Sequence, residues 1–395
     1  MAFTVSGDAL TSHRIQPLLI LGASARSAAY SASRAGLVPS AVDQFCDEDL
    51  RSCCTAHRAV DYPHDLPRIA WELPESPWMY TGALENHPSL VDTIGATRTL
   101  YGNPGSVLRA VRDPLRVAAV FCGAGLPHLD VRSSPPRAQA GEWLRKPLDS
   151  CGGTRIALAT AADVREQGQR DNAFYYQRLA DGDPASAIYV ADGNRALLLG
   201  VTRQLVGLTW AGGVGFQYGG SIGPLQLALE ADKQVRRIGT CLTVDCGLKG
   251  LFGVDLVVAG DMVWPIEVNP RYTASVEVIE RAYSISAISL HVAVFRGQAL
   301  PTSVSHASDH FVGKAIVYAR QPAVVPKSFD DLALRLNADL SWPALADIPA
   351  TGTELKPGQP IATVLAAGVS ESAVERRLKE LACQVRRVVS ASGDG

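Results

Sequence analysis

The chain has 395 residues, of which 47% are hydrophobic and 19% are charged, and its formal net charge is −2. This length predicts two or three domains of an ordinary globular protein. The nearly neutral charge gives no reason to expect nucleic acid or an anionic membrane as a partner. No apolar run approaches the roughly 20 residues that span a bilayer, and the first residues do not resemble a signal peptide. The eight cysteines include no C-x-x-C pair, so we expect reduced thiols in a cytoplasmic protein.

The first stretch of the chain predicts a parallel α/β layer. Residues 17–21 form an apolar strand pattern, an Ala/Ser-rich helix follows Gly22 up to about Arg34, and residues 39–43 predict a second strand. This order places a ligand site at the N-terminus of the helix. Only Gly22 of the three dinucleotide-binding glycines is present, but Asp43 lies about 20 residues beyond the loop, so a nucleotide site stays open here. We expect the domain to end between residues 95 and 105.

Two apolar helix patterns follow, at residues 107–111 and 115–121, and then a possible phosphate site. A strand from Leu144 ends at Lys146, and Gly152 and Gly153 form a loop before a strand at residues 155–158. A lysine at a strand end opposite a glycine loop can hold phosphates, because glycine lets backbone N–H groups approach closely.

The middle of the chain alternates short strands with glycine-rich turns. A strand pattern occupies residues 186–190, and a turn follows at residues 192–194. The glycine-dense stretch at residues 210–224 predicts either a mobile loop whose N–H groups meet a developing oxyanion or a flexible connection. A helix pattern follows at residues 225–238.

Residues 252–268 predict a β-hairpin that carries three oxygen-bearing side chains. Gly260 and Asp261 form the turn between two apolar strands. Glu267 and Asn269 share one face because side chains alternate along a strand, and the hairpin can bring Asp255 opposite them. Two carboxylates and an amide oxygen suit a hard cation such as Mg²⁺. The alternative is that these are solvent-facing residues of an ordinary hairpin, although unpaired charges in so apolar a segment would be costly.

The rest of the chain predicts an apolar helix at residues 282–295, short strands with Pro and Gly turns from residue 310, and a last helix at residues 371–388. The segments FGVDLVV and PIEVNPR resemble the metal-binding hairpin of the ATP-grasp superfamily, whose second strand reads E-x-N-x-R. Within it, the run VNPRYTASVE resembles the predicted ATP-dependent carboligases related to biotin carboxylase. The resemblance extends over nearly the whole chain. It implies a pre-ATP-grasp Rossmann-like domain at residues 1–100, an ATP-grasp domain of two α+β lobes at 101–300, and a β-rich C-terminal lobe with a terminal helix at 301–395.

The resemblance also implies roles for individual residues. Asp255, Glu267 and Asn269 would hold Mg²⁺ (or Mn²⁺), and Lys146, Arg271, Tyr218 and Gly220 would serve the reaction, with Gly219 nearby. ATP would contact Lys146, Gly152, Gly153, the base-edge segment Gln177, Arg178 and Leu179, and a ribose-binding acid, either Asp183 or Asp181. Pro114 stands near the position of the family's first phosphate-binding lysine, so Arg112 or Arg116 would replace it. Ser24 and Arg26 are candidates for a substrate site.

The implied activity is ATP-dependent ligation of a small-molecule carboxylate to an amine through an acyl phosphate, with release of ADP and phosphate. Some members of the group are associated with one-carbon carriers of the methanopterin or methylofuran type, and homodimers are common in related folds. The alternatives are a non-catalytic ATP-binding regulatory protein, suggested by the unusual RDP segment, and a Rossmann-type oxidoreductase, which the missing glycines disfavour.

Overall fold

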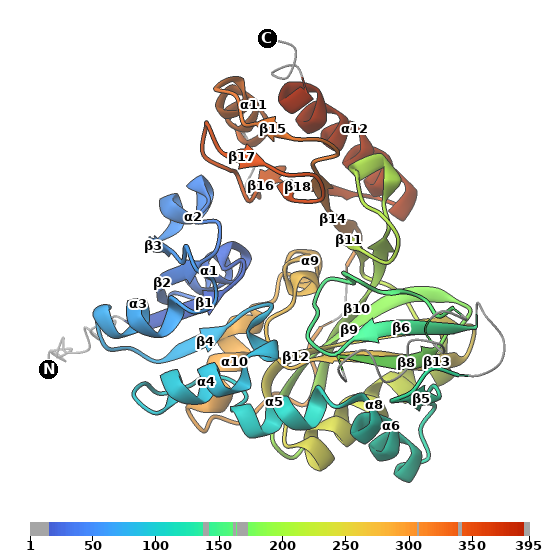
Figure 1. Ribbon diagram of the computed structural model, residues 1–395. Coiled ribbons are helices and arrows are strands. Elements are labelled where there is room, and N and C mark those ends of the chain that lie inside the picture. The colour runs from blue at the N-terminus through green and yellow to red at the C-terminus, as the bar shows by residue number, and fades with distance from the viewer. Residues whose placement is uncertain are drawn as a thin grey trace, which may run out of the picture.

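The computed structural model describes residues 16–136, 142–160, 163, 173–305, 308–338 and 342–390. Three layers are visible in Figure 1: an N-terminal α/β layer, a small antiparallel sheet, and a large antiparallel sheet that continues into the C-terminal segment. The mixed α/β and α+β architecture expected from the sequence is confirmed. Within the described ranges no single helix is long and apolar enough to cross a membrane, and helices α9 (Ala274–Tyr283) and α10 (Ala287–Phe295) reach that length only as a pair bent by 111°.

The N-terminal layer is a parallel sheet with strand order β3-β2-β1-β4. The two predicted strands are confirmed and are joined by the expected helix, which begins at Arg26. The carboxyl ends of these strands therefore face the rest of the molecule at one edge. The elements of this layer are β1 (Pro17–Gly22), α1 (Arg26–Arg34), β2 (Val38–Asp43), α2 (Glu48–Cys53), β3 (Thr55–Arg58), α3 (Leu66–Glu72), β4 (Trp78–Tyr80), η1 (Leu84–Asn86) and α4 (Pro88–Gly95).

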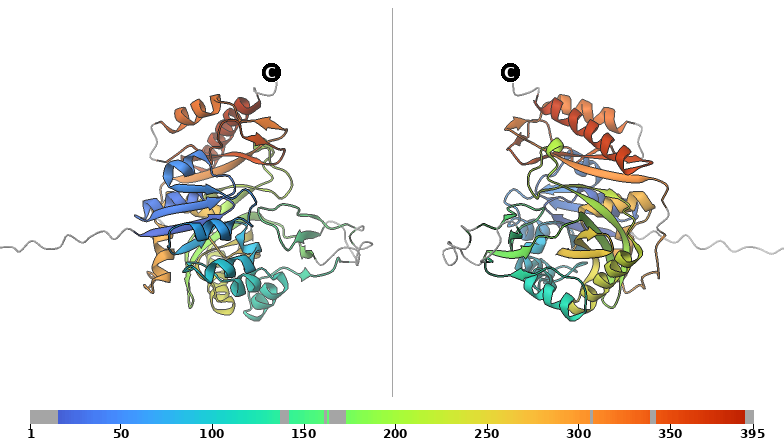
Figure 2. Two further views of the ribbon diagram at one scale, coloured as in Figure 1. Left: turned by 60° about the vertical axis from the view of Figure 1, so that its left-hand side comes forward. Right: turned by 90° about the vertical axis from the view of Figure 1, so that its right-hand side faces the viewer.

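The small sheet has the order β5-β8-β6-β7 and projects to one side of the molecule, as both views of Figure 2 show. The strand predicted at residues 155–158 is only two residues long, because Arg155 has a left-handed φ of 61° and cannot extend it. Of the two helices that precede the sheet, α6 contacts β5, whereas α5 packs against α4 and α6. The elements are α5 (Gly105–Val111), α6 (Pro114–Gly123), β5 (Val131–Arg132), β6 (Trp143–Pro147), β7 (Ala157–Leu158) and β8 (Phe174–Arg178).

The large sheet has the order β13-β12-β9-β10-β11-β14-β18-β16, and all of its neighbouring strands are antiparallel. The predicted hairpin is confirmed as β12 and β13. The glycine-dense stretch differs from the expected loop, because its second half is a paired strand, β11. The elements before the C-terminal segment are β9 (Asp183–Asp192), β10 (Ala196–Val206), η2 (Thr209–Ala211), β11 (Tyr218–Gly223), α8 (Leu229–Cys246), β12 (Lys249–Ala259), β13 (Met262–Asn269), α9 (Ala274–Tyr283) and α10 (Ala287–Phe295).

Two predicted helices have different bounds in the structure. The helix expected from residue 225 begins at Leu229, because the backbone N–H of Leu225 still pairs with the β10 carbonyl of Val201 at 2.7 Å. The helix expected at residues 282–295 is broken after Tyr283. Ser284 adopts a left-handed φ of 52°, and Ser286 caps a new helix by accepting from the backbone N–H of residue 289.

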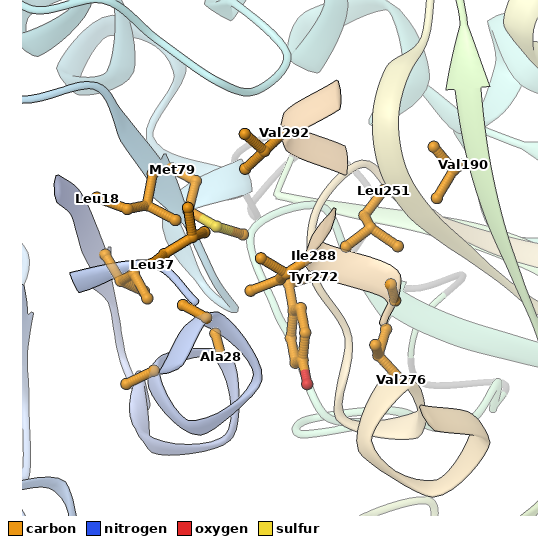
Figure 3. Packing of buried hydrophobic residues seen from close by; sticks show 14 of the residues in the cluster. Leu18, Ala28, Leu37, Met79, Val190, Leu251, Tyr272, Val276, Ile288 and Val292 are labelled. Carbon is orange, nitrogen blue, oxygen red and sulfur yellow. The ribbon is translucent and has the colours of Figure 1, made fainter. Parts of the chain in front are cut away.

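Helices cover both faces of the large sheet. Alternate side chains of each strand point to opposite faces, so each strand contributes to both cores. Tyr189 on β9 packs with α8, whereas its neighbours Ile188 and Val190 pack with α9 and α10. The core that contains Ile188 and Val190 continues into the N-terminal layer, where it includes Leu18 and Met79 (Figure 3). The N-terminal layer is thus joined to the large sheet by continuous apolar packing.

Strands β14, β16 and β18 of the C-terminal segment extend the large sheet, whereas β15 and β17 form a separate two-stranded sheet. β14 pairs with β11 on one side and with β18 on the other, and α12 covers them. The domain boundary predicted at residue 300 remains a prediction. The large sheet contains strands from both sides of that boundary. The elements are β14 (Phe311–Tyr318), β15 (Ala323–Val324), α11 (Ser328–Asn337), β16 (Leu345–Ala346), β17 (Glu354–Leu355), β18 (Pro360–Gly368) and α12 (Glu371–Ser390).

Candidate active site

A cavity of about 340 Å³ lies between the small sheet and the large sheet. Its lining combines apolar side chains with a few convergent polar groups, which is the usual composition of a small-molecule site. Eleven of the residues singled out in the sequence line it: Lys146, Gly152, Gly153, Gln177, Arg178, Leu179, Tyr218, Asp255, Glu267, Asn269 and Arg271. The structure therefore brings together residues that are up to 125 positions apart in the chain.

The hairpin places its acidic side chains opposite each other. Asp255 on β12 is the register partner of Glu267 on β13, and a bulge follows this pair. Gln204 donates to one oxygen of Asp255 at 2.7 Å, and the Asn269 amide donates to the other at 3.2 Å. Burial and the neighbouring Glu267 charge together raise the pKa of Asp255 to about 6. Two facing carboxylates thus form the negative side of the cavity.

Glu267 is balanced by two cations from other elements. Burial alone would raise its pKa, but Arg112 and Lys146 hold the pKa of Glu267 below its usual value. Arg112 forms an ion pair with Glu267 and also donates to the carbonyl of Ser150 at 2.9 Å. One of the two arginines proposed to replace the family lysine is therefore held by a carboxylate in the cavity wall.

Lys146, at the end of β6, is 4% exposed and points across the cavity toward β13. Its Nζ donates to the side-chain oxygen of Gln177 at 3.1 Å and to the carbonyl of Ile266 at 3.2 Å. Burial opposes its charge, but Tyr175 and Glu267 raise the pKa of Lys146 above its usual value. The ammonium group is therefore a fixed positive charge between the two sheets.

Arg271 follows β13 and is held by a residue that the sequence did not indicate. Its Nε and Nη2 donate to Oε1 of Glu85 at 2.9 and 2.6 Å, and Nη2 also donates to Asn269 at 3.1 Å. Burial opposes its charge, but Glu85 raises the pKa of Arg271 above its usual value. Oε2 of Glu85 is buried without a hydrogen-bond partner in the described part of the chain. This pair fixes a guanidinium at the cavity edge next to the N-terminal layer.

The glycine loop of the small sheet closes against the start of β11. The carbonyl of Gly152 accepts from the backbone N–H of Tyr218 at 2.9 Å. Gly153 has a φ of 73°, and a Cβ there would lie 1.9 Å from the carbonyl oxygen of Phe216. Glycine is therefore required at residue 153 both for its backbone conformation and for the close approach of the two loops.

Several candidate residues lie outside the cavity. Arg116 is exposed on α6, and Gly220 is buried where a Cβ would lie 2.0 Å from the carbonyl oxygen of Lys314. Both acids considered for the ribose, Asp181 and Asp183, are exposed beside the cavity, although the residues that flank Asp183 line it.

The two substrate candidates also lie away from the cavity. The Ser24 side chain is exposed, at the edge of the N-terminal sheet, whereas Arg26 is 1% exposed and forms ion pairs with Glu277 and Asp347. The structure thus separates these two residues from the group that lines the cavity.

The backbone of the expected base-edge segment is partly occupied. The amide of Arg178 donates to the carbonyl of Asp130 at 2.9 Å, and that of Leu179 donates to Glu142 at 2.7 Å. These two N–H groups are not free to bind a base edge. The dinucleotide alternative meets a similar obstacle, because the Asp43 carboxylate accepts from the loop amides of Ala25 and Cys46.

The hairpin residues fit a divalent cation by their chemistry. Within the described ranges no three His, Cys, Asp or Glu side chains form a metal-binding group, and the hairpin offers two carboxylates and one amide instead. Hard cations accept such oxygen ligands and complete their coordination with water or phosphate oxygens. The opposition of Asp255 and Glu267 in register leaves two negative charges that a cation would balance.

Comparison with known proteins agrees with this geometry. Residues 117–275 match the ATP-grasp domain family. Among solved structures, the chain resembles L-amino acid ligase from Bacillus licheniformis (TM-score 0.67, 15% identity, 94% of this chain and 98% of the other). It also resembles the biotin carboxylase domain of the Hydrogenobacter thermophilus 2-oxoglutarate carboxylase (TM-score 0.70, 12% identity, 92% and 89%).

A sequence relative is the formate-dependent phosphoribosylglycinamide formyltransferase of Pyrococcus furiosus, which is 35% identical over 86 residues. This alignment covers 21% of the chain and 20% of the relative. The chain thus shares its fold with these solved structures, and the match to the ATP-grasp domain family is limited to residues 117–275.

Sequence reasoning did not find three residues that shape the cavity: Glu85, Gln204 and, as the partner of Glu267, Arg112. Each reaches its partner from an element at least 51 residues away in the chain. A polar residue on the apolar strand β10 was the only local signal for Gln204, and Glu85 lies in η1, a 3-10 helix of three residues that is too short to show a periodic pattern.

Proposed function

We propose that this protein is an ATP-dependent carboxylate–amine ligase that forms a C–N bond through an acyl phosphate. The observation that supports this most strongly is the convergence of two fixed cations, Lys146 and Arg271, with the facing carboxylates of Asp255 and Glu267 on one cavity. Such a set can hold a metal–triphosphate complex and balance the charge of a transferring phosphoryl group.

In the proposed reaction, a carboxylate oxygen of the acid attacks the γ-phosphorus of ATP, and the bond to the β-phosphate oxygen breaks to release ADP. The amine nitrogen then attacks the acyl carbon, loses one proton, and displaces phosphate to leave an amide. Lys146 and Arg271 offset the charge on the phosphate oxygens, and the loop at Gly152 and Gly153 excludes water from the acyl phosphate. Bound Mg²⁺ or Mn²⁺ would add Lewis-acid stabilisation of the phosphate oxygens.

The names of the similar proteins support the same class. One structural neighbour is an L-amino acid ligase, and the sequence relative is a formyltransferase that depends on formate. Both names describe chemistry of a carboxylic acid and an amine. A role in making a one-carbon carrier remains a prediction from the resemblance.

The test is Mg²⁺-dependent release of ADP from ATP, screened against pooled carboxylic acids and pooled amines, with hydroxylamine added to trap acyl phosphate as a hydroxamate. We expect hydroxamate with one acid pool, and amide formation only when the matching amine pool is also present. Tight binding of ATP without ADP or hydroxamate in any pool would contradict the proposal.

That contradictory result would favour the second candidate, an ATP-binding regulatory protein. The feature that favours it is the state of the two candidate arginines. Arg112 is paired with Glu267 and Arg116 is exposed, so neither is free in the cavity to replace the family's first phosphate-binding lysine. A site that binds ATP without this contact could lack the positioning needed for turnover.

A further inference from the structure

Uncharged polar side chains line the cavity where it meets α9, which packs on β10 and β11 (Figure 1). We call this part of the lining the polar end, and its residues are Gln204 on β10, Tyr218 on β11, and Thr273 and Ser275 at the start of α9. The charged side chains Lys146, Asp255 and Glu267 come from β6, β12 and β13 instead. The polar end is therefore available to the groups that react.

Gln204 is held in a single orientation. The residue is 9% exposed, and its Nε2 donates to Oδ1 of Asp255 at 2.7 Å. An ionised carboxylate can only accept hydrogen bonds, so the NH₂ group of the Gln204 amide must face Asp255. Oε1 of Gln204 therefore points away from Asp255, and no residue in the described part of the chain donates a hydrogen bond to it. The polar end thus contains a fixed acceptor that lacks a donor.

Thr273 supplies a second unpartnered group, from the helix side of the polar end. It precedes α9, is 7% exposed and does not cap the helix with its side chain. Its hydroxyl oxygen is buried without a hydrogen-bond partner among the residues that the structure describes. The first N–H groups of a helix have no partners within the helix, and they make its N-terminus electropositive. The polar end therefore combines an electropositive helix terminus with a free acceptor, which suits a ligand that presents both an oxygen and an N–H group.

Ser221 joins Gln204 to the start of α9. It is the register partner of Gln204 across the pair formed by β10 and β11, and its hydroxyl lies 3.0 Å from that of Ser275 in the first turn of α9. The hydroxyl of Tyr218 lies 2.8 Å from the same Ser221 oxygen. Neighbouring strands are about 4.8 Å apart, so one acyl group and its nucleophile can contact Gln204 and the start of α9 together.

The polar end suits an uncharged nitrogen. Asp255 and Glu267 are the only carboxylates among the described residues that line the cavity, and both belong to the proposed metal site. A protonated amine would have no free carboxylate to balance it, and burial of an unpaired charge is costly. An uncharged primary amine has two N–H donors and one lone pair. It can therefore donate one N–H to Gln204 and keep the lone pair for bond formation.

We infer that Gln204 binds and orients the attacking amine in its uncharged form, through a hydrogen bond from the amine N–H to Oε1. This inference rests on the proposed ligase function and names the form of the second substrate that the site accepts. The lone pair forms the C–N bond, the bond from the acyl carbon to the phosphate oxygen breaks, and one N–H proton leaves with the phosphate. The start of α9 favours the negative charge that develops on the acyl oxygen.

The first experiment measures amine binding without turnover. Saturation-transfer NMR is recorded on the full chain with Mg²⁺, a non-hydrolysable ATP analogue and the pooled carboxylic acids, between about pH 7 and pH 9. The probes are pooled primary amines and their N,N-dimethyl counterparts, which have no N–H group when uncharged. We expect only the primary amines to bind. Their affinity should rise about tenfold per pH unit below the pKa of the amine, because only the uncharged fraction binds.

Two variants separate amine binding from metal binding. Gln204→Met keeps the length of the side chain but removes both the acceptor and the donor to Asp255. Ser186→Ala is the matched control, because Ser186 also hydrogen-bonds the Asp255 carboxylate, from β9, but is not part of the polar end. Both variants should raise the Mg²⁺ concentration needed to bind the ATP analogue. Primary amines should bind at least about tenfold more weakly to Gln204→Met and equally well to Ser186→Ala. In the turnover assay, Gln204→Met should lower the amide formed per ADP released at least about tenfold, because water then takes the acyl phosphate.

The inference is overturned if no primary amine binds, if the N,N-dimethyl amines bind equally well, or if Gln204→Met binds primary amines as well as the wild type does. An affinity that stays constant or falls as pH rises would also overturn it, since the protonated amine would then be the form that binds. If amine binding depends on Gln204 but no acid yields hydroxamate, the amine site stands and the proposed ligase activity fails. If hydroxamate forms and Gln204→Met changes neither amine binding nor the amide yield, the ligase stands and this role of Gln204 fails.

Discussion

The pair formed by Glu85 and Arg271 offers the sharpest test of the site, because one substitution separates its structural and its functional consequences. In Glu85→Gln the side chain keeps its shape and its Oε1 acceptor but loses its charge. The Glu85 side chain is fully buried and that of Arg271 is 11% exposed. Removing one partner of a buried ion pair typically costs about 3–5 kcal/mol. Asn269 and the carbonyl of Tyr272 still accept from Arg271, so we expect about 3 kcal/mol, the lower end of that range.

Nucleotide should reverse part of this loss. If Arg271 faces phosphate, the anionic triphosphate restores a partner for the guanidinium, and the gain in stability from Mg²⁺ and an ATP analogue should exceed that of the wild type by about 1–2 kcal/mol. The measurement is urea unfolding with and without the nucleotide, followed by kcat. We expect kcat to fall at least ~10-fold, because the guanidinium is no longer fixed.

The matched control is Glu72→Gln, which breaks an exposed ion pair with Arg68 and should change stability by less than about 1 kcal/mol. The reasoning is refuted if Glu85→Gln is as stable as this control without nucleotide. It is also refuted if the nucleotide stabilises the variant no more than the wild type, since Arg271 would then have no phosphate to bind.

Four further predictions concern Glu267 on the hairpin, Lys146, the glycine loop at residues 152–153, and the buried carboxyl group of Asp47. Glu267→Gln should lower kcat at least ~100-fold in an activity assay. Lys146→Met should weaken ATP binding about 10- to 100-fold, measured by calorimetry, because a buried charged donor is lost. Gly153→Ala should raise KM for ATP more than Gly152→Ala, because both glycines have positive φ but only residue 153 meets a backbone oxygen at 1.9 Å. The folded-state pKa of Asp47, about 8, exceeds its unfolded value, so Tm should fall as pH rises from 5 to 8, and Asp47→Asn should reduce this slope.

Each of these predictions has a result that contradicts it. Full activity of Glu267→Gln would remove that residue from a metal site, and unchanged ATP affinity of Lys146→Met would remove the lysine from the phosphate site. Equal KM values for the two glycine variants would mean that ATP binding does not depend on the close approach of Gly153 to the carbonyl oxygen of Phe216. A Tm slope that is the same in Asp47→Asn would assign the pH dependence to other groups.

Much of the hairpin could be predicted because its signals are local. The apolar strands and the Gly-Asp turn predict the pairing as far as Leu256 and Pro265, and a bulge after Asp255 then shifts that residue from Ile266 to Glu267. Lys146 was indicated by its position at a strand end before the Gly152-Gly153 loop, and the resemblance to the ATP-grasp superfamily then supported its role. The contacts of Glu85 and Arg112 could not be predicted, because they join segments 186 and 155 residues apart that only the packing of layers brings together.

The glycine-dense stretch shows a different limit. Its composition suggested flexibility, yet Gly220 lies in a paired strand where a Cβ would approach the neighbouring backbone to 2.0 Å. Glycine can indicate either freedom or crowding, and only the neighbouring strand decides between them. The break between α9 and α10 was missed for a similar reason, since the left-handed Ser284 has no strong local signal.

The large sheet has a mechanical consequence for how the cavity opens. β11 is bonded to β10 on one side and to β14 on the other, so the C-terminal segment and the strands that carry Asp255 and Glu267 form one stiff frame. The small sheet shares no strand pairing with that frame in the described ranges. We therefore expect the entry of ATP to require a swing of the small sheet, with Lys146 and the glycine loop travelling together, while the carboxylate wall stays still.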